Sequence, residues 1–255
     1  YFPGEDVFVT SGFETNAAGS SLTVKVPEGV DFSEGQSVRV VTKSGGSATN
    51  RNTQIYAEKG MVADFDTNGA LVWPWDWGWG ISGEMIQPSQ PGISGLEGSF
   101  GGMNQAFPAN YGWNNDKVIN LTNWGGAQIF PEGEGYEPST PATSFDIRFE
   151  VAINTSASIA GLEMQIWYPD SNGNELSYNI PMSDFITKTD GSWYTLSANM
   201  TRLTNGSTRL NTYGDFLKGD GGGVKQLRLV VTNTTSNDIQ AVLGVDNVRV
   251  VRAVN

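Results

Sequence analysis

The sequence predicts an all-β protein that is divided into two domains. Its 255 residues include 32 glycines and 11 prolines, and Thr, Ser and Asn are abundant, which is typical of short strands joined by tight turns. Alternating or β-branched runs recur along the chain, whereas no segment has a convincing helical period. We therefore expect a small β domain at residues 1–58 and a larger β-sandwich at residues 59–255.

The first domain is predicted from three strand-like runs that Gly, Asn and Ser turns separate. These runs lie at residues 7–9, 22–26 and 37–42. With its Gly-Glu-Asp-Val start at 4–7 and its Val-Pro-Glu-Gly-Val run at 26–30, this unit resembles the immunoglobulin-like IPT/TIG module, in a shortened copy. The alternative is that residues 1–58 are the N-terminal part of one continuous sandwich.

The larger domain is predicted from further runs with the same properties. They lie at residues 61–66, 144–153, 161–168, 176–180, 193–198, 225–232 and 243–251. Strands at this spacing are typical of a sandwich of two antiparallel sheets. The glycine-rich segment at 219–223 lacks the Gly-Lys-Ser/Thr ending of a phosphate-binding loop, so we interpret it as a turn.

The composition excludes several classes of chemistry. The chain has no Cys and no His, so thiolate nucleophiles, Ser-His-Asp catalysis and imidazole or thiolate metal sites are excluded. Fifteen Lys and Arg against 27 Asp and Glu give a net charge of −12, which disfavours nucleic acid, anionic lipid and acidic polysaccharides as ligands. No apolar stretch approaches the ~20 residues of a membrane-spanning helix. A neutral ligand is compatible with this charge.

The most distinctive feature is the Trp-Pro-Trp-Asp-Trp-Gly-Trp-Gly run at residues 73–80. In an extended strand, alternation places its four indoles on one face, over about 20 Å at ~3.3 Å per residue. This is the length of a short oligosaccharide, and the C–H face of a sugar ring packs well on an indole. We therefore predict that Trp75, Trp77 and Trp79 bind such a ligand. The alternative is that Pro74 and the glycines break the strand and that some indoles are buried.

A second candidate site lies on the strand expected at residues 161–168. Alternation places Glu163, Gln165 and Trp167 together on one face. Amide and carboxylate groups can hydrogen-bond sugar hydroxyls beside a stacking indole, so these three residues predict a binding face. The alternative is an ordinary solvent-exposed face with one Trp. The opposite, core-facing set is Leu162, Met164 and Ile166.

Three other tryptophans are assigned separately. Trp113 and Trp124 lie in polar loops rich in Asn and Gly, and loops on a rigid sandwich often carry binding residues. Both are therefore predicted to bind ligand. Trp193 is not assigned to the site, because the Gly-Ser-Trp-Tyr-Thr segment at 191–195 resembles the Gly-x-Trp-x-Thr strand of carbohydrate-binding β-sandwiches, and this resemblance implies that Trp193 packs in the core.

Four runs in the larger domain resemble the strands of carbohydrate-binding β-sandwiches. Residues 145–151 followed by 161–167 resemble their paired central strands, Gly-Ser-Trp-Tyr-Thr-Leu at 191–196 resembles their Gly-x-Trp-x-Thr strand, and 245–250 resembles their closing strand. With the IPT/TIG-like unit ahead of them, this order resembles the C-terminal part of surface glycan-binding proteins of polysaccharide-utilising gut bacteria. Members of that family that bind xyloglucan or other β-glucans resemble the chain most.

The resemblance implies a non-catalytic protein that holds a neutral polysaccharide or oligosaccharide at the cell surface for uptake. Xyloglucan, mixed-linkage glucan and laminarin are the candidate ligands. The family is anchored on the extracellular face of the outer membrane as lipoproteins, and it serves a glycan importer complex. The chain has no lipobox Cys, so such an anchor is expected upstream of Tyr1. The resemblance requires no cofactor.

The resemblance also raises the prediction of a structural Ca²⁺ site, because related sandwiches often hold one between their first and last strands. Asp64 or Asp66, together with Asp246, would supply the oxygen ligands. The alternative is that these residues have simple turn and edge-strand roles. Residues 64–69 copy the start of an EF-hand loop, but Trp75 stands at the twelfth position, where that loop needs a Glu, so an EF-hand is excluded.

Two functions of other classes remain as alternatives. The Glu-Gly-Glu-Gly-Tyr-Glu run, with Glu132, Glu134 and Glu137, has the spacing of the Glu-x-Asp-x-x-Glu motif of β-glucanases, and would make the protein a glycoside hydrolase or lyase. The glycines and flanking prolines of this run argue against the rigid pair of carboxylates that glycoside hydrolysis needs. The other alternative is a protein-binding adhesin whose tryptophans are buried.

Overall fold

The chain divides into two compact units, Tyr1–Ala57 and Glu58–Asn255. The computed structural model describes residues 9–11, 13–15, 22–24, 38–41, 47–49, 60–63, 65, 86–96, 98–109, 117–122, 136–218 and 226–253. In the first unit, two antiparallel pairs occur among these residues. They are β1 (Phe13–Thr15) with β2 (Leu22–Val24), and β3 (Arg39–Val41) with β4 (Ser47–Thr49). The assignment of this unit to the IPT/TIG-like class stays a prediction.

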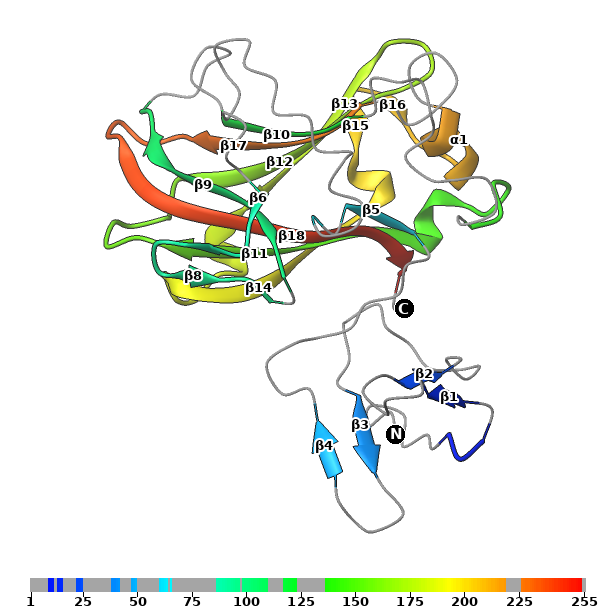
Figure 1. The fold of residues 1–255 in the computed structure, drawn as a ribbon. Helices are drawn as coiled ribbons and strands as arrows, with labels where there is room; N and C mark the ends of the chain where they lie inside the picture. The colour runs from blue at the N-terminus through cyan, green and yellow to red at the C-terminus, as the bar shows by residue number, and fades with distance from the viewer. Residues whose placement is uncertain are drawn as a thin grey trace. The chain divides into compact units, whose positions relative to one another are not determined.

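The second unit is a sandwich of two antiparallel sheets, which form the two layers in Figure 1. Among the described residues, sheet I has the order β10 (Lys117–Thr122), β17 (Gln226–Asn233), β12 (Leu162–Pro169), β13 (Glu175–Pro181), β15 (Thr204–Asn205) and β16 (Thr208–Arg209). Sheet II has the order β14 (Asp190–Asn199), β11 (Phe145–Asn154), β18 (Ile239–Arg252), β9 (Phe100–Phe107) and β6 (Ile86–Gln87), and β5 (Met61–Ala63) also pairs with β18.

Short elements connect these strands. A small hairpin of β7 (Ser89–Gln90) and β8 (Ile93–Ser94) precedes β9. Among the residues that the structure describes, the 3-10 helices are η2 (Ala142–Ser144), η3 (Met182–Asp184) and η4 (Met200–Arg202), and the α-helix α1 (Tyr213–Lys218) follows β16.

The core lies between the two sheets and is built by strict alternation. On β11 every second residue, Phe145 to Ile153, is fully buried, and on β12 Leu162, Met164, Ile166 and Tyr168 are fully buried too. Residues between them point away from the core, because successive side chains of a strand alternate in direction. Alternation on β12 therefore fixes which of its side chains face outward from sheet I.

A β-bulge changes the alternation of β18. Leu243 and Val245 face the core before it, and Val248 and Val250 face the core after it. The extra residue lies at Asn247–Val248, where Asn247 has a φ of 48° and the pairing register with β11 shifts. The bulge therefore places Asp246 and Arg249 on the same outer face of sheet II.

The prediction of an all-β fold is confirmed, and the predicted runs of the larger domain overlap β5, β11, β12, β13, β14, β17 and β18. Strands β9 and β10 were not predicted. In β9, Gly101 and Gly102 gave a turn signal, whereas the structure uses them for close packing. A Cβ at Gly101 would lie 2.8 Å from the ring of Phe65, and one at Gly102 would lie 2.7 Å from the side chain of Gln90.

Candidate functional site

The outward residues of β12 form a strip along the middle of sheet I. Glu163, Gln165 and Trp167 are each half-buried, and each stands between fully buried neighbours. Strand β12 pairs with β13 on one side and with β17 on the other. The strip is therefore flanked by outward residues of both neighbouring strands, and the alternation predicted for these three residues is observed.

One flank of the strip is a hydrogen-bonded amide chain. Asn179 on β13 stands opposite Gln165 in the strand register. Its Nδ2 donates to Glu163 Oε2 at 2.7 Å, and its Oδ1 accepts from Gln165 Nε2 at 2.8 Å. Asn179 is exposed, so these polar groups are held in place while they remain accessible to solvent.

The other flank is an Arg that stacks on the indole. Trp167 pairs with Arg228 of β17 and with Ser177 of β13. The guanidinium carbon of Arg228 lies 4.3 Å from the centre of the Trp167 ring. Burial lowers the pKa of Arg228, and Glu175 opposes this shift, but an Arg remains charged at neutral pH. One indole face is thus covered by a cation, and the small Ser177 lies on the other side.

Sequence reasoning identified part of this arrangement and missed the rest. It found the three residues of β12 by alternation, but not Asn179 or Arg228, because these meet the strip only through the register of strand pairing. An outward position on a predicted strand was the signal available for both. Trp75, Trp77, Trp79, Trp113, Trp124 and Glu134 lie outside the described residues, so their predicted roles stay predictions.

Trp193 packs against a hydrophobic cluster, as expected, but not against the main core between the two sheets. Its neighbours Tyr194 and Leu196 point toward the main core, whereas Trp193 lies on the outer face of sheet II, where it is half-buried. There it meets Phe100 edge-on, with ring centres 5.2 Å apart, and its Nε1 donates to Ser94 O at 2.8 Å. Trp193 therefore anchors the β7–β8 hairpin in a small separate cluster.

The outer face of sheet II carries a buried ion pair. Arg249 binds Glu150 through two contacts, of 2.6 and 2.9 Å, and donates to Asn247 O at 2.7 Å. Glu150 also accepts from Thr195 Oγ1 at 3.2 Å. Asp246 stands opposite Glu150 in the register and is fully buried.

These acidic residues bear on the predicted Ca²⁺ site. Arg249 neutralises Glu150 and occupies both of its oxygens, so this carboxylate is not available to a cation. Within the described residues, no three acidic side chains come close enough to hold a metal ion. Asp64 and Asp66 lie outside that part of the chain, and the Ca²⁺ site with Asp246 stays a prediction.

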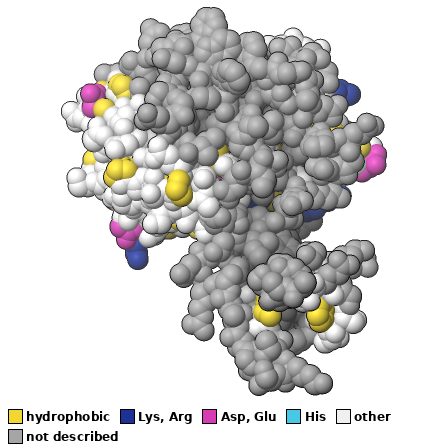
Figure 2. Space-filling view, in the orientation of Figure 1, with side chains coloured by type: hydrophobic (Ala, Val, Ile, Leu, Met, Phe, Trp, Pro, Cys, Tyr) yellow, Lys and Arg dark blue, Asp and Glu magenta, His cyan; other side chains and the backbone are white. Residues whose placement is uncertain are grey.

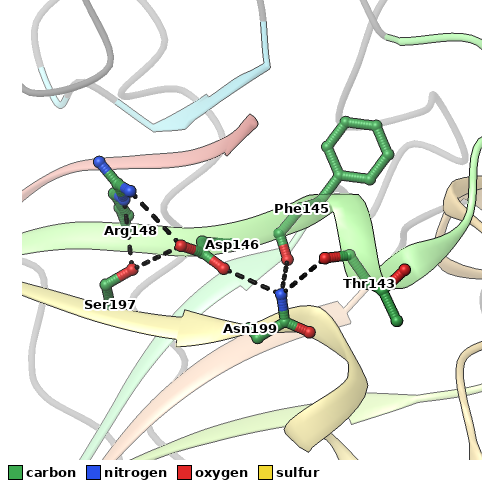
Figure 3. A network of polar contacts seen from close by, with 6 residues as sticks. All are labelled: Thr143, Phe145, Asp146, Arg148, Ser197 and Asn199. Carbon is green, nitrogen blue, oxygen red and sulfur yellow. Dashed lines mark hydrogen bonds and ion pairs between the residues drawn. The ribbon is translucent and has the colours of Figure 1, made fainter. Parts of the chain in front are cut away.

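A second polar network joins β11 to β14 at the edge of sheet II (Figure 3). Asp146 accepts from Ser197 Oγ at 3.3 Å and from Arg148 at 3.4 Å. Asn199 Nδ2 donates to Asp146 Oδ1 at 3.1 Å and to the backbone oxygens of Thr143 and Phe145 at 3.0 Å. The donors and acceptors of this network satisfy one another between adjacent strands, which gives it a structural role.

On the face drawn in Figure 2, the hydrophobic side chains of the described residues lie in separate spots and form no continuous apolar surface. The large exposed hydrophobic residues among those described are Phe13, Leu22, Val40 and Phe185.

None of the helices in the described ranges has the length and hydrophobicity needed to cross a membrane.

The antiparallel sandwich and the open strip of Trp, amide and carboxylate groups define a class of protein, the carbohydrate-binding β-sandwiches. A family model narrows this class. The model of the surface glycan-binding protein B xyloglucan-binding domain matches residues 55–252. The chain belongs to this family, whose proteins bind glycans and are non-catalytic, and the resemblance found in the sequence is confirmed.

Solved structures with the same fold agree with this placement. SGBP-B from a complex xyloglucan utilization locus in Bacteroides uniformis is 22% identical with a TM-score of 0.51, over 94% of this chain and 62% of that one. A structure with xylogluco-oligosaccharide is 18% identical with a TM-score of 0.50, over 94% of this chain and 48% of that one. The chain thus spans less than two thirds of either protein. The comparison with curated proteins found no match.

Proposed function

We propose that this chain binds a neutral β-glucan, with xyloglucan as the main candidate, on the outer face of sheet I. The observation that carries the proposal is the half-exposed Trp167 beside the hydrogen-bonded groups of Glu163, Asn179 and Gln165. Membership in a family of xyloglucan-binding domains supports the class of ligand.

The strip has the parts that a glycan chain needs. A sugar ring stacks on the face of Trp167 that Arg228 leaves open, and its hydroxyls hydrogen-bond to Gln165 and Asn179. Trp167 lies four positions after Glu163, which corresponds to about 13 Å along a strand. The strip therefore accommodates a short internal segment of a polymer.

The charges of the face favour a neutral polymer. Glu163 in the strip and Glu175 on the adjacent strand β13 outnumber the one described cation beside them, Arg228, and the whole chain has a net charge of −12. A uronic-acid polymer would be repelled by these carboxylates. Trp75, Trp77, Trp79, Trp113 and Trp124 are proposed to add further stacking surfaces for the same ligand.

The cellular setting is also part of the proposal. A lipid anchor upstream of Tyr1 would hold the protein on the extracellular face of the outer membrane, beside a glycan importer complex. Many weak sites on one surface would then retain a polymer strongly, because bound neighbours raise the effective concentration. Co-purification of the importer with the full-length protein from outer membranes tests this part, and its absence there would contradict it.

Affinity electrophoresis tests the proposed ligand class. The gels contain xyloglucan, mixed-linkage glucan, laminarin, mannan or a polyuronate as the charged control. We expect retardation in xyloglucan and in related β-glucan gels, and unchanged mobility in polyuronate. Retention by polyuronate alone, or by no glucan, would contradict the proposal. Release of reducing sugar from the bound polymer would instead favour an enzyme.

A further inference from the structure

The side-chain hydrogen bonds between β12 and β13 are all donated in one direction, from Gln165 to Asn179 and from Asn179 to Glu163. Asn179 stands between Glu163 and Gln165, and it donates to the first and accepts from the second. Glu163 and Gln165 are two positions apart on β12, and both are on the outward face. A carboxylate, an amide and a second amide therefore form a continuous chain of three groups.

The carboxylate determines the orientation of both amides. An ionised Glu only accepts hydrogen bonds, so Asn179 must turn its NH₂ group toward Glu163. Its carbonyl oxygen then faces Gln165, and a carbonyl also only accepts, so Gln165 must turn its own NH₂ group toward Asn179. The 2.7 Å contact to Glu163 is charge-assisted, which makes it the strongest link.

The N–H and carbonyl positions that this chain of hydrogen bonds leaves unused also have a defined pattern. Each amide has two N–H groups and a carbonyl with two acceptor positions, and the chain uses only some of them. Gln165 keeps its carbonyl oxygen and one N–H, and Asn179 keeps one N–H. Two neighbouring hydroxyls of a sugar ring match such a set, because one can donate to the carbonyl while the other accepts from an N–H.

We propose that Glu163 is a positioning residue, which fixes the donor and acceptor pattern that Asn179 and Gln165 present to a vicinal diol of a glucan chain. This inference rests on the proposed function of the same face. Glu163 acts on Gln165 only through Asn179, since the two residues share that amide as a hydrogen-bond partner.

The NMR signals of the side-chain amides test, without any ligand, whether Glu163 orients Gln165 through Asn179. Glu163→Gln preserves shape but allows its amide to meet Asn179 in either orientation. We expect the NH₂ signals of both Asn179 and Gln165 to shift. Asp184→Asn, which removes the same charge at an exposed residue, is the control and should shift neither signal. In an Asn179→Ala background, Glu163→Gln should no longer move the Gln165 signal. If Glu163→Gln leaves the Gln165 signal unchanged, Glu163 does not orient Gln165, and the positioning role is overturned.

Affinity for a xylogluco-oligosaccharide tests the functional half of the inference. We expect Glu163→Gln to bind about fivefold more weakly, which is the effect of weakening one hydrogen bond, while Asp184→Asn binds like the parent protein. Trp167→Ala separates the two claims. Unchanged affinity in Trp167→Ala overturns the proposed function of the face. Weakened binding in Trp167→Ala with unchanged binding in Glu163→Gln overturns only the positioning role.

Discussion

The guanidinium carbon of Arg228 lies 4.3 Å from the centre of the Trp167 ring, and the two residues are direct partners in the pairing of β17 with β12. The indole is therefore supported on one side before any ligand arrives. A supported ring loses less conformational freedom on binding than a free one. This relationship makes Trp167 a prepared stacking surface rather than a loosely exposed side chain.

Arg228→Ala is expected to weaken β-glucan binding roughly two- to fivefold, because a cation–π contact at a partly exposed site contributes about 0.5–1 kcal/mol. Arg228→Lys is the matched variant, since it keeps the charge but loses the planar stacking group. Titration calorimetry should place Arg228→Lys nearer to Arg228→Ala than to the parent. Tighter binding by Arg228→Ala would mean that the Arg obstructs the indole instead of supporting it.

Glu150→Ala is expected to lower the free energy of unfolding by about 3–5 kcal/mol, because it leaves the Arg249 guanidinium buried without its carboxylate. The two side chains are only 3% and 1% exposed. Glu150→Leu combined with Arg249→Met removes both charges and should recover most of the loss. Urea unfolding measures both variants, and a double variant as unstable as the single one would contradict this view of the pair.

Asp170→Asn is expected to destabilise the protein at neutral pH but to have little effect in acid. Burial raises the pKa of Asp170, but hydrogen bonds from Asn174 and Asn172 outweigh it, so the pKa lies below its ordinary value. A pKa lowered by folding means stabilisation above the unfolded-state pKa, which is lost as the pH falls through the folded-state pKa.

Urea midpoints of Asp170→Asn and the parent protein should therefore differ at pH 7, and the difference should shrink below about pH 4 and disappear as the pH falls through the lowered folded-state pKa of Asp170. Asp184→Asn, at an exposed position, is the control and should match the parent at both values. A difference between Asp170→Asn and the parent that persists unchanged in acid would show that the carboxylate charge is not the stabilising factor.

Gly191→Ala is expected to destabilise the sandwich by about 2–4 kcal/mol. Gly191 has a φ of +88°, and a Cβ there would lie 1.9 Å from Gly92 O, so the variant combines backbone strain with a clash against the β7–β8 hairpin. Gly173 has a φ of +76° with nothing within 4 Å of the added atom, and Gly173→Ala should cost only about 1–2 kcal/mol. Equal losses in thermal unfolding would exclude the clash as the cause.

Sequence patterns predicted those features of the fold that depend only on alternation within a single strand. The outward strip of β12 follows from alternation alone, as does the buried face of β11. Trp193 packs against a hydrophobic cluster, as expected, but this cluster is the small one on the outer face of sheet II, where the alternation with Tyr194 and Leu196 places it. Strand β9 was missed because its glycines serve contacts with Phe65 and Gln90 that are distant in sequence.

The parts that could not be predicted depend on how strands pair. Asn179 and Arg228 join the candidate site through the registers of β13 and β17, which alternation within one strand does not contain. The ion pair of Glu150 with Arg249 depends on the bulge at Asn247–Val248, which shifts the alternation of β18 by one residue. A local deviation in one strand thus decides which charges meet.

The most direct test is titration calorimetry of a xylogluco-oligosaccharide with the parent protein, Trp167→Ala and Trp193→Phe. Trp193→Phe is the matched control, because it changes a Trp on the other sheet that serves packing. We predict that Trp167→Ala loses at least about tenfold in affinity, as expected for an aromatic anchor of a binding surface, while Trp193→Phe binds like the parent. Equal affinity in Trp167→Ala and the parent would contradict the assignment of the binding face to sheet I.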